Sequence, residues 1–307
     1  MKRFLRHILF FFVSGWLIFS GLDIMLSREF QKDRYKPVRS FTYLMKGTID
    51  ADVIFLGSSR VLNHFAPYVL DSVLLVNSYN LGMAGAHFDD LLARYRLYRE
   101  RNKTPKLVMI GVDYFSMTRN SGTNMDQFYP WFHDRSFRKA FFQARHFSFA
   151  DRFLPMYRFR RDWINIISER GDWALEKGFL GFDKSFVGPK LDDSTINNSS
   201  LGFNVNPEVE RDFQVLLDLI SSDGAKAVLV QTPMYESALR RRKNPAEMKE
   251  YYDSISRLRN IPVLDYERCF VSGDTSFFTN SQHMNRRGAE VFTDTLAHDL
   301  ERLGLVK

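Results

Sequence analysis

An apolar tetrapeptide that runs into a glycine and two serines constrains the fold of this chain most. Residues 53–56 read Val-Ile-Phe-Leu and lead directly into Gly57-Ser58-Ser59. An unbroken apolar run of this length is typical of a parallel strand that is buried on both faces. A serine after such a strand lies at the carboxyl edge of the sheet, where open α/β folds build their sites. The alternative is a Gly-Ser turn that only caps the next helix.

Strand-like and helix-like segments alternate along most of the chain. We expect strands at residues 53–56, 74–76, 107–112, 225–230 and 261–264. We expect helices with one buried face at about 67–73, 88–98, 207–223, 245–259 and 289–300, and proline sits in the first turn of three of them. This alternation predicts an α/β fold with a doubly wound, flavodoxin-like, five-stranded parallel sheet and helices on both faces.

Three segments fall outside this alternation and set the expected domain boundaries. Residues 1–27 are read as a membrane anchor or signal segment, and residues 28–50 as a polar, basic linker. The α/β domain is expected over 51–307, with a helical insertion at about 116–205 where strand signals are sparse.

The amino terminus has the composition of a membrane-spanning helix. Lys2, Arg3 and Arg6 precede an apolar stretch from Ile8 to Leu26 that only Asp23 interrupts. A span needs roughly 17–25 residues, so Asp23 is expected near the outer interface. A cleaved signal peptide is the alternative. The basic residues favour a cytoplasmic amino terminus, which places the remainder outside the cytoplasmic (inner) membrane as a single-pass protein.

The formal net charge of +7 is concentrated in the insertion. Residues 135–161 contain eight Lys or Arg and one acid, Asp151, together with many aromatic side chains. Such a segment binds an anionic membrane surface or an acidic polymer, or is the solvated face of amphipathic helices. The chain has no zinc-finger spacing and no RNA-binding aromatic motif, so we do not expect a nucleic-acid partner.

Three loops carry the residues that could do chemistry. Ser59 follows the first strand, Gly82 and Gly85 follow the second, and His283 lies in the loop before the last helix. All three loops open at the same edge of the expected sheet, so they can converge. A serine becomes a nucleophile when a neighbouring base takes its proton, and His283 is the candidate base.

The same three loops resemble the motifs of the SGNH (GDSL-like) hydrolase and acyltransferase superfamily. The first motif corresponds to Gly57-Ser58-Ser59, and the Asn-x-x-x-x-Gly motif corresponds to residues 80–85. The Asp-x-x-His-x-Asn-x-x-Gly-Ala motif corresponds to residues 280–289, with Asn280 at the usual aspartate. The resemblance covers residues 52–115 and 206–303. The superfamily also has an asparagine after its third strand, where this chain has Asp113.

The resemblance implies a role for each matched residue. Ser59 is the nucleophile, His283 the base and Asn280 the group that orients its ring, without the negative charge of an aspartate. The backbone N–H groups of Gly85 and Ser59 are the expected oxyanion hole. Candidate auxiliary residues at the site are Asp113, Asp274 and Arg60. Asp274 is a possible substitute for Asn280, and Arg60 is expected to be exposed.

The membrane segment and the serine pair look closest to the membrane-anchored branch that assists O-acylation of cell-surface polysaccharides. We therefore expect an extracytoplasmic serine acyltransferase or esterase that acts on O-acyl, chiefly acetyl, groups of a surface glycan through an acyl-serine. Its expected partners are an acyl donor, the polysaccharide and a membrane-bound acyl-transfer protein. We expect no cofactor and no metal. The alternative is a non-catalytic glycan-binding or assembly protein that keeps a degenerate fold.

Overall fold

The computed structural model describes residues 1–32, 36–119, 127–144, 147–160, 176–187 and 201–306. They divide into two compact units, one formed by residues 49–123 and 174–307 and the other by residues 1–48 and 124–173. Parts of the predicted insertion, with Arg145 and Arg161 of the basic segment, lie outside the described residues.

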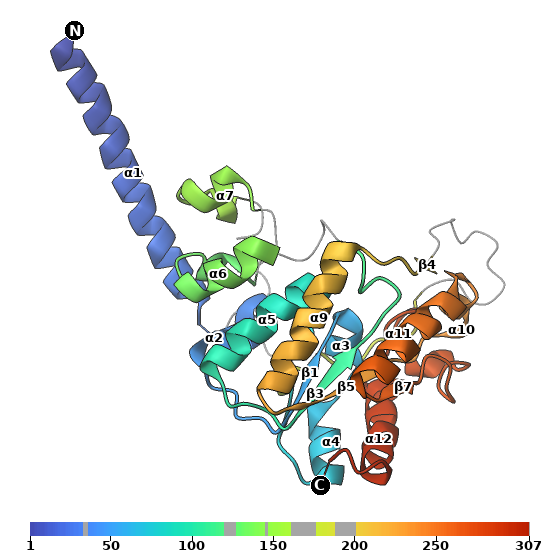
Figure 1. Ribbon diagram of the computed structural model, residues 1–307. Helices are drawn as coiled ribbons and strands as arrows, with labels where there is room; N and C mark the ends of the chain where they lie inside the picture. The colour runs from blue at the N-terminus through green and yellow to red at the C-terminus, as the bar shows by residue number, and fades with distance from the viewer. Residues whose placement is uncertain (33–35, 120–126, 145–146, 161–175, 188–200, 307) are drawn as a thin grey trace. The chain divides into compact units, whose positions relative to one another are not determined.

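The larger unit is built on a five-stranded parallel sheet, as the sequence predicts (Figure 1). Its strands are β1 (Val53–Leu56), β2 (Ser78–Asn80), β3 (Leu107–Gly111), β5 (Lys226–Gln231) and β7 (Val263–Asp265). Their spatial order is β2-β1-β3-β5-β7, the flavodoxin-like order. The order reverses beside β1, so the crevice at the carboxyl ends of β1 and β3 is the natural position for a site.

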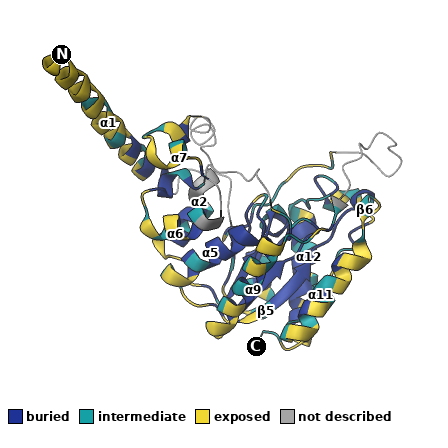
Figure 2. Cartoon of the chain, turned by 45° about the horizontal axis from the view of Figure 1, so that its top comes forward, coloured by how far each residue is buried: buried dark blue, intermediate teal, exposed yellow. Residues whose placement is uncertain are grey.

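Helices cover both faces of this sheet (Figures 1 and 2). One face carries α3 (Ser59–His64), α4 (Pro67–Leu74) and α12 (Arg286–Arg302), which pack on one another. The other carries α5 (Phe88–Arg101), α9 (Pro207–Ser222) and α11 (Pro245–Arg259). Short elements complete this unit: α10 (Glu236–Leu239), η3 (Thr275–Phe277) and a two-stranded pair of β4 (Leu201–Gly202) with β6 (Arg242–Lys243).

The predicted second strand at residues 74–76 is wrong. Helix α4 begins at Pro67 and continues through Leu74, and Leu75 ends it in the left-handed conformation with φ of 53°. The apolar residues of this stretch therefore belong to the end of a helix. The strand β2 forms four residues after α4 ends, from the polar residues 78–80, and pairs with β1.

The smaller unit joins the amino terminus to the insertion. It contains α1 (Lys2–Phe30), α2 (Lys36–Lys46), η1 (Tyr129–Trp131), α6 (Arg135–Ala144), α7 (Phe149–Phe153) and η2 (Tyr157–Phe159). Phe41 of α2 is fully buried, and its ring packs on the rings of Phe128, Phe137 and Phe141. Residues 36–46 of the expected linker are thus a helix packed on the insertion.

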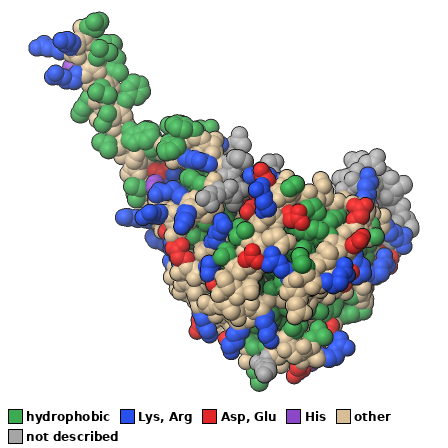
Figure 3. All heavy atoms as spheres, viewed as in Figure 1, with side chains coloured by type: hydrophobic (Ala, Val, Ile, Leu, Met, Phe, Trp, Pro, Cys, Tyr) green, Lys and Arg blue, Asp and Glu red, His purple; other side chains and the backbone are tan. Residues whose placement is uncertain are grey.

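Helix α1 is long and apolar enough to cross a membrane (Figure 3). Only 6% of its most apolar window is buried against the described residues of the protein. The end of α1 is different, because Asp23, Ser27 and Phe30 are buried against the insertion. Asp23 accepts hydrogen bonds from Met156 N–H (2.7 Å) and pairs with Arg158 and His133.

Candidate active site

The nucleophile candidate stands on the first turn of α3, directly after β1. Ser58 caps this helix, because its Oγ accepts a hydrogen bond from the N–H of Arg60 at 3.2 Å. Ser59 is the first helical residue. A Cβ atom at Gly57 or Gly111 would meet Val61 at 2.2 Å or 2.1 Å. Two glycines therefore let α3 approach the ends of β1 and β3 closely.

Ser59 and His283 form a hydrogen bond across the site. Ser59 Oγ lies 2.8 Å from His283 Nε2, although 224 positions separate the two residues in the chain. This distance is within the range required for proton transfer from a hydroxyl to a base. The structure thus brings together the two residues that the motifs predict as nucleophile and base.

Asn280 fixes the orientation and the tautomer of His283. Its side-chain oxygen accepts hydrogen bonds from the backbone N–H groups of Gln282 (2.9 Å) and His283 (3.0 Å), so this atom has to be the amide oxygen. The same oxygen lies 3.1 Å from His283 Nδ1. Nδ1 therefore carries the proton, which leaves Nε2 free to accept the proton of Ser59.

The surroundings of His283 keep its imidazole neutral. Burial and, to a smaller extent, the nearby Arg60 cation lower the pKa of His283 to about 4, although the Asp113 carboxylate acts in the opposite direction. His64 is fully buried beside it, and its ring centroid is 6.4 Å from that of His283. His64 Nε2 accepts a hydrogen bond from Met284 N–H at 3.0 Å, so His64 supports the loop that carries the base.

Arg60 is buried rather than exposed, so its expected position is wrong. Its guanidinium donates to Asp113 Oδ1 at 2.5 Å and to the backbone oxygen of Thr232. Asp113 also accepts a hydrogen bond from Ser58 Oγ at 2.6 Å. These hydrogen bonds connect the two neighbours of Ser59 at the start of α3 to Asp113, which follows β3. Arg60 faces a carboxylate there, so it serves the site as a structural support.

The end of β2 and the loop that follows it contact α3, the helix that carries Ser59. Asn80 is buried and donates to the backbone oxygens of Val61 (2.8 Å) and Phe65 (2.9 Å), which holds α3 against this loop. Gly85 lies in the turn before α5 and has φ of 67°. The N–H of Ser59 belongs to the first turn of α3, where amides have no partner within the helix. The oxyanion roles of Gly85 and Ser59 stay predictions.

Asp274 does not take the place of Asn280. Its carboxylate caps η3 by accepting the N–H of Ser276 at 2.8 Å, while Asn280 holds the imidazole. Asn285 caps α12, because its side-chain oxygen accepts a hydrogen bond from Gly288 N–H at 2.9 Å. Among the described residues, no group of three His, Cys, Asp or Glu side chains is placed to hold a metal ion.

A segment at residues 176–187 connects the loops that carry the candidate site residues, and our sequence analysis did not predict this role. The backbone oxygen of Lys177 accepts from Asn80 N–H (2.8 Å), and Leu180 N–H donates to Leu62 (3.0 Å). Further along, Val187 N–H donates to Thr279 at 2.7 Å. This part of the predicted insertion therefore belongs to the α/β unit. The one available signal was Gly178, where a Cβ would meet the Asn80 oxygen at 1.9 Å.

A second contact that the sequence analysis did not predict joins the segment after β3 to the loop that carries His283. Tyr114 follows Asp113, and its hydroxyl donates to Gln282 Oε1 at 2.9 Å. Because Gln282 precedes His283, this bond fixes the approach of the base to Ser59. Nothing in the sequence motifs distinguishes Tyr114, since its partner comes from 168 positions away.

No protein-family profile and no curated protein matches this chain. Solved structures do match. One, named as a G-D-S-L family lipolytic protein from Desulfitobacterium hafniense DCB-2, is 11% identical, with a TM-score of 0.42 over 81% of this chain and 99% of its own. A GDSL-like lipase from Bacteroides thetaiotaomicron VPI-5482 is 12% identical, with a TM-score of 0.43, and the match covers 87% of this chain and 100% of the lipase. An acylhydrolase from Bacteroides fragilis NCTC 9343 is 12% identical, with a TM-score of 0.43, and the match covers 85% of this chain and 95% of the acylhydrolase. Likenesses of this size do not decide what the chain does, and the geometry around Ser59 has to carry the argument.

Proposed function

We propose that this protein is a serine esterase or O-acyltransferase of the SGNH type, with Ser59 as nucleophile and His283 as base. The observation that carries the proposal is the chain of contacts Ser59 Oγ–His283 Nε2 (2.8 Å) and His283 Nδ1–Asn280 Oδ1 (3.1 Å). These three residues lie at the carboxyl edge of a parallel sheet, where open α/β folds place their sites.

The reaction that this geometry supports has two steps. Ser59 Oγ attacks the carbonyl carbon of an ester while its proton moves to His283 Nε2. The ester C–O bond then breaks, and His283 returns that proton to the departing alcohol, which leaves an acyl group on Ser59. Water or an acceptor hydroxyl next attacks the acyl carbon, with His283 again taking and returning the proton. Water gives hydrolysis and a hydroxyl gives transfer.

The proposed setting is the outer side of the cytoplasmic membrane, with α1 as an uncleaved anchor. The length of α1 and the basic residues at its amino-terminal end support this orientation. The burial of Asp23 and Ser27 in the smaller unit supports retention of α1, because cleavage at the end of the 1–27 segment would remove both side chains. In this setting the substrates are an acyl donor, supplied by a membrane-bound acyl-transfer protein, and O-acetyl positions of a surface glycan.

One observation favours a second candidate, a non-catalytic glycan-binding or assembly protein. Asn280 is neutral, so it does not stabilise the imidazolium that forms during the reaction. The Arg60 cation also disfavours that imidazolium. A protein that uses the fold only for binding would tolerate both features.

Hydrolysis of a chromogenic acetyl ester distinguishes the two candidates. Wild type and the surface control Ser72→Ala, whose serine is exposed on α4, are expected to be equally active. We expect Ser59→Ala and His283→Ala to lose activity by about 10²–10⁴-fold, the usual contribution of a positioned base. Equal rates in all four proteins would contradict catalysis at Ser59 and favour the binding protein.

A further inference from the structure

Helix α6 in the smaller unit has one apolar and one cationic face. Arg135, Arg138, Lys139 and Phe142 follow the spacing i, i+3, i+4 and i+7, so they share one side of the helix. The opposite side carries Phe137 and Phe141, which are fully buried. The apolar side holds the unit together, and the three cations of the other side are exposed.

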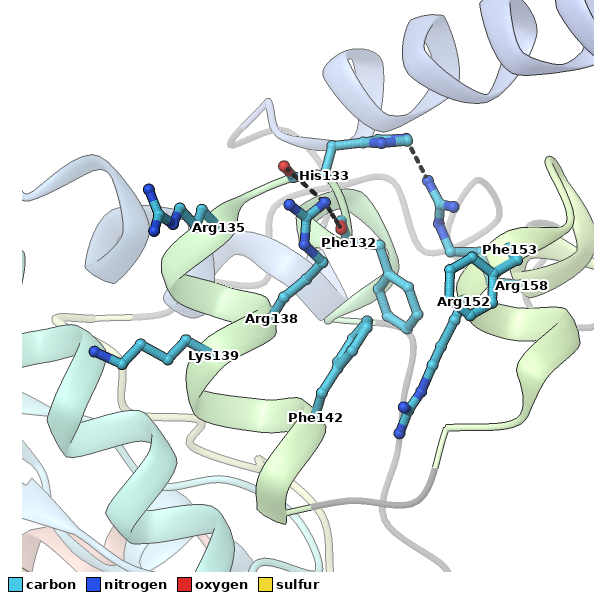
Figure 4. A pocket seen from close by; sticks show the side chains of 9 residues that line it. All are labelled: Phe132, His133, Arg135, Arg138, Lys139, Phe142, Arg152, Phe153 and Arg158. Atoms are coloured by element: carbon cyan, nitrogen blue, oxygen red, sulfur yellow. Dashed lines mark hydrogen bonds between the residues drawn. The ribbon is translucent and has the colours of Figure 1, made fainter.

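The cationic face of α6 forms a wall of a cavity of about 590 Å³ (Figure 4). Arg152 and Phe153 of α7 line the cavity with it, and the rings of Phe132 and Phe142 stand between the two helices. Arg152 lies over the ring of Phe142, 4.8 Å from its centroid. The cavity thus combines four cations with aromatic surfaces, which suits an anion that carries apolar groups.

Most of this positive charge is not neutralised by the protein. Within the described part of the chain, Arg135 and Lys139 form no ion pair. Among the described residues, Arg138 donates to the backbone oxygens of Phe132 (3.4 Å) and His133 (3.5 Å) and forms no ion pair. Arg158 also lines the cavity, but Asp23 pairs with it. The nearby Asp151 is bound to Arg160 and Ser148.

The cavity lies where the apolar part of α1 ends. Two of its lining residues, His133 and Arg158, are bonded to Asp23 of α1. The exposed apolar side chains of α1 continue only to Met25. On α7, Phe149 is 73% exposed and Phe153 is 56% exposed. In a membrane-anchored protein this level corresponds to the lipid headgroups, where aromatic and basic side chains gather.

We propose that this cavity binds the phosphate headgroup of an anionic phospholipid. The arginines and lysine of α6 and α7 bind the phosphate, while Phe142 and Phe153 contact the glycerol and the first acyl carbons. The proposal rests on the membrane anchorage in the proposed function and is independent of chemistry at Ser59. Lipid binding by the insertion would fix the distance between the smaller unit and the surface of an anionic membrane.

Native mass spectrometry of the full-length protein in a neutral detergent tests the site. Short-chain phosphatidylglycerol is titrated against short-chain phosphatidylcholine, and inorganic phosphate is a third arm. The triple variant Arg135→Gln, Arg138→Gln, Lys139→Gln removes the cations of α6. The matched control Lys226→Gln, Arg257→Gln, Arg302→Gln removes three exposed cations of the other unit.

We expect wild type and control to bind one phosphatidylglycerol in preference to phosphatidylcholine. The α6 variant is expected to bind it on the order of 100-fold more weakly, about fivefold for each lost charge. Equal binding by both triple variants, or no preference over phosphatidylcholine, would overturn the proposal. Inorganic phosphate that binds as tightly as the lipid would show a phosphate site and overturn the lipid assignment. Ester hydrolysis by the same α6 variant reports separately on Ser59, so failure of either proposal is seen alone.

Discussion

Asn280 shows how an amide can take the place of a carboxylate beside the imidazole of His283, the proposed base. Its oxygen is held by the N–H groups of Gln282 and His283, so the side chain cannot turn its NH₂ group toward the imidazole. The histidine is left with its proton on Nδ1, which is the tautomer a base needs. The site therefore keeps the orienting function of an aspartate and lacks only its charge.

Asn280→Asp is expected to raise ester hydrolysis. The carboxylate would accept the same three N–H groups and would also stabilise the imidazolium, which we expect to increase kcat/KM by about 10- to 100-fold. This gain is well below the roughly 10⁴-fold that a wrong tautomer costs a serine protease, because the tautomer is already correct. Asn280→Ala should lose activity, since nothing then orients the ring. A gain with alanine, or none with aspartate, would contradict this role; steady-state kinetics decides.

The pH dependence of hydrolysis follows from the pKa of His283, which burial lowers to about 4. The base acts only when neutral, so kcat/KM is expected to stay constant from pH 8 to about pH 5 and to fall as the pH passes through 4. A midpoint near the usual histidine value of 6.5 would contradict the buried geometry.

Stability has to be followed at each pH as well. His283 and the buried His64 both have lowered pKa values, so between pH 6.5 and 4 the unfolded chain binds more protons than the folded one. Folding stability is therefore complete above pH 6.5 and decreases on acidification. Near-UV circular dichroism on the same samples separates unfolding from protonation of the base.

At the scale of elements, the position of Ser59 depends on how closely α3 approaches its neighbours. A Cβ at Gly82 would lie 2.4 Å from the backbone nitrogen of Leu62, so this glycine lets the β2 loop touch α3. Asn80 bonds to the end of the same helix from the start of that loop. The first turn of α3 is thus set by packing from β2, β3 and the residues 176–187.

Gly82→Ala is expected to displace α3 and reduce both stability and activity. The new methyl group would contact backbone atoms that cannot turn away, and overpacking of this kind costs about 1–3 kcal/mol. Gly273→Ala is the matched control, because nothing lies within 4 Å of its Cβ position. Chemical denaturation and ester hydrolysis measure the two effects. Similar stability and activity in the two variants would show that α3 is not held by this contact.

The sequence predicts the elements whose signals are local. The strands at 53–56 and 107–111 are continuous apolar runs, and the strand at 226–231 contains one at 227–230. The side chains of Asn206 and Asn285 cap their helices, a role to which asparagine is well suited. The second strand was misplaced because Leu74 to Val76 read equally well as strand or helix end. The bonds of Asn80, Tyr114 and residues 176–187 join segments that are far apart in the chain, and no local pattern encodes them.

At the scale of the whole molecule, the chain forms two units whose sequences interleave. The smaller unit takes α1 and α2 from the amino terminus and α6 and α7 from the middle of the chain. Helix α1 and the described part of the basic insertion are therefore one structural unit, joined by Asp23, Arg158 and His133. Composition marks both segments, but the contacts that join them, such as the buried Asp23–Arg158 ion pair and the ring contact of Phe30 with Phe159, link residues far apart in the chain.

Asp23→Ala is expected to loosen the smaller unit alone. It leaves Arg158, whose side chain is 4% exposed, without its carboxylate, and such a loss costs about 3–5 kcal/mol. Asp151→Ala is the control, because the Asp151–Arg160 pair is partly exposed and worth at most about 1 kcal/mol. Hydrogen exchange of full-length protein in detergent should accelerate at residues 129–131 and 157–159 in the first variant only. Equal exchange in both would contradict a structural role of Asp23.

The central claim is that Ser59 carries an acyl group during the reaction. Intact-mass spectrometry after incubation with an activated acetyl ester tests it, with Ser59→Ala and Ser72→Ala alongside. We expect a single acetyl adduct on wild type and on Ser72→Ala, located at Ser59 by peptide mapping, and none on Ser59→Ala. An adduct that persists in Ser59→Ala, or folded wild-type protein that is never acylated, would contradict it.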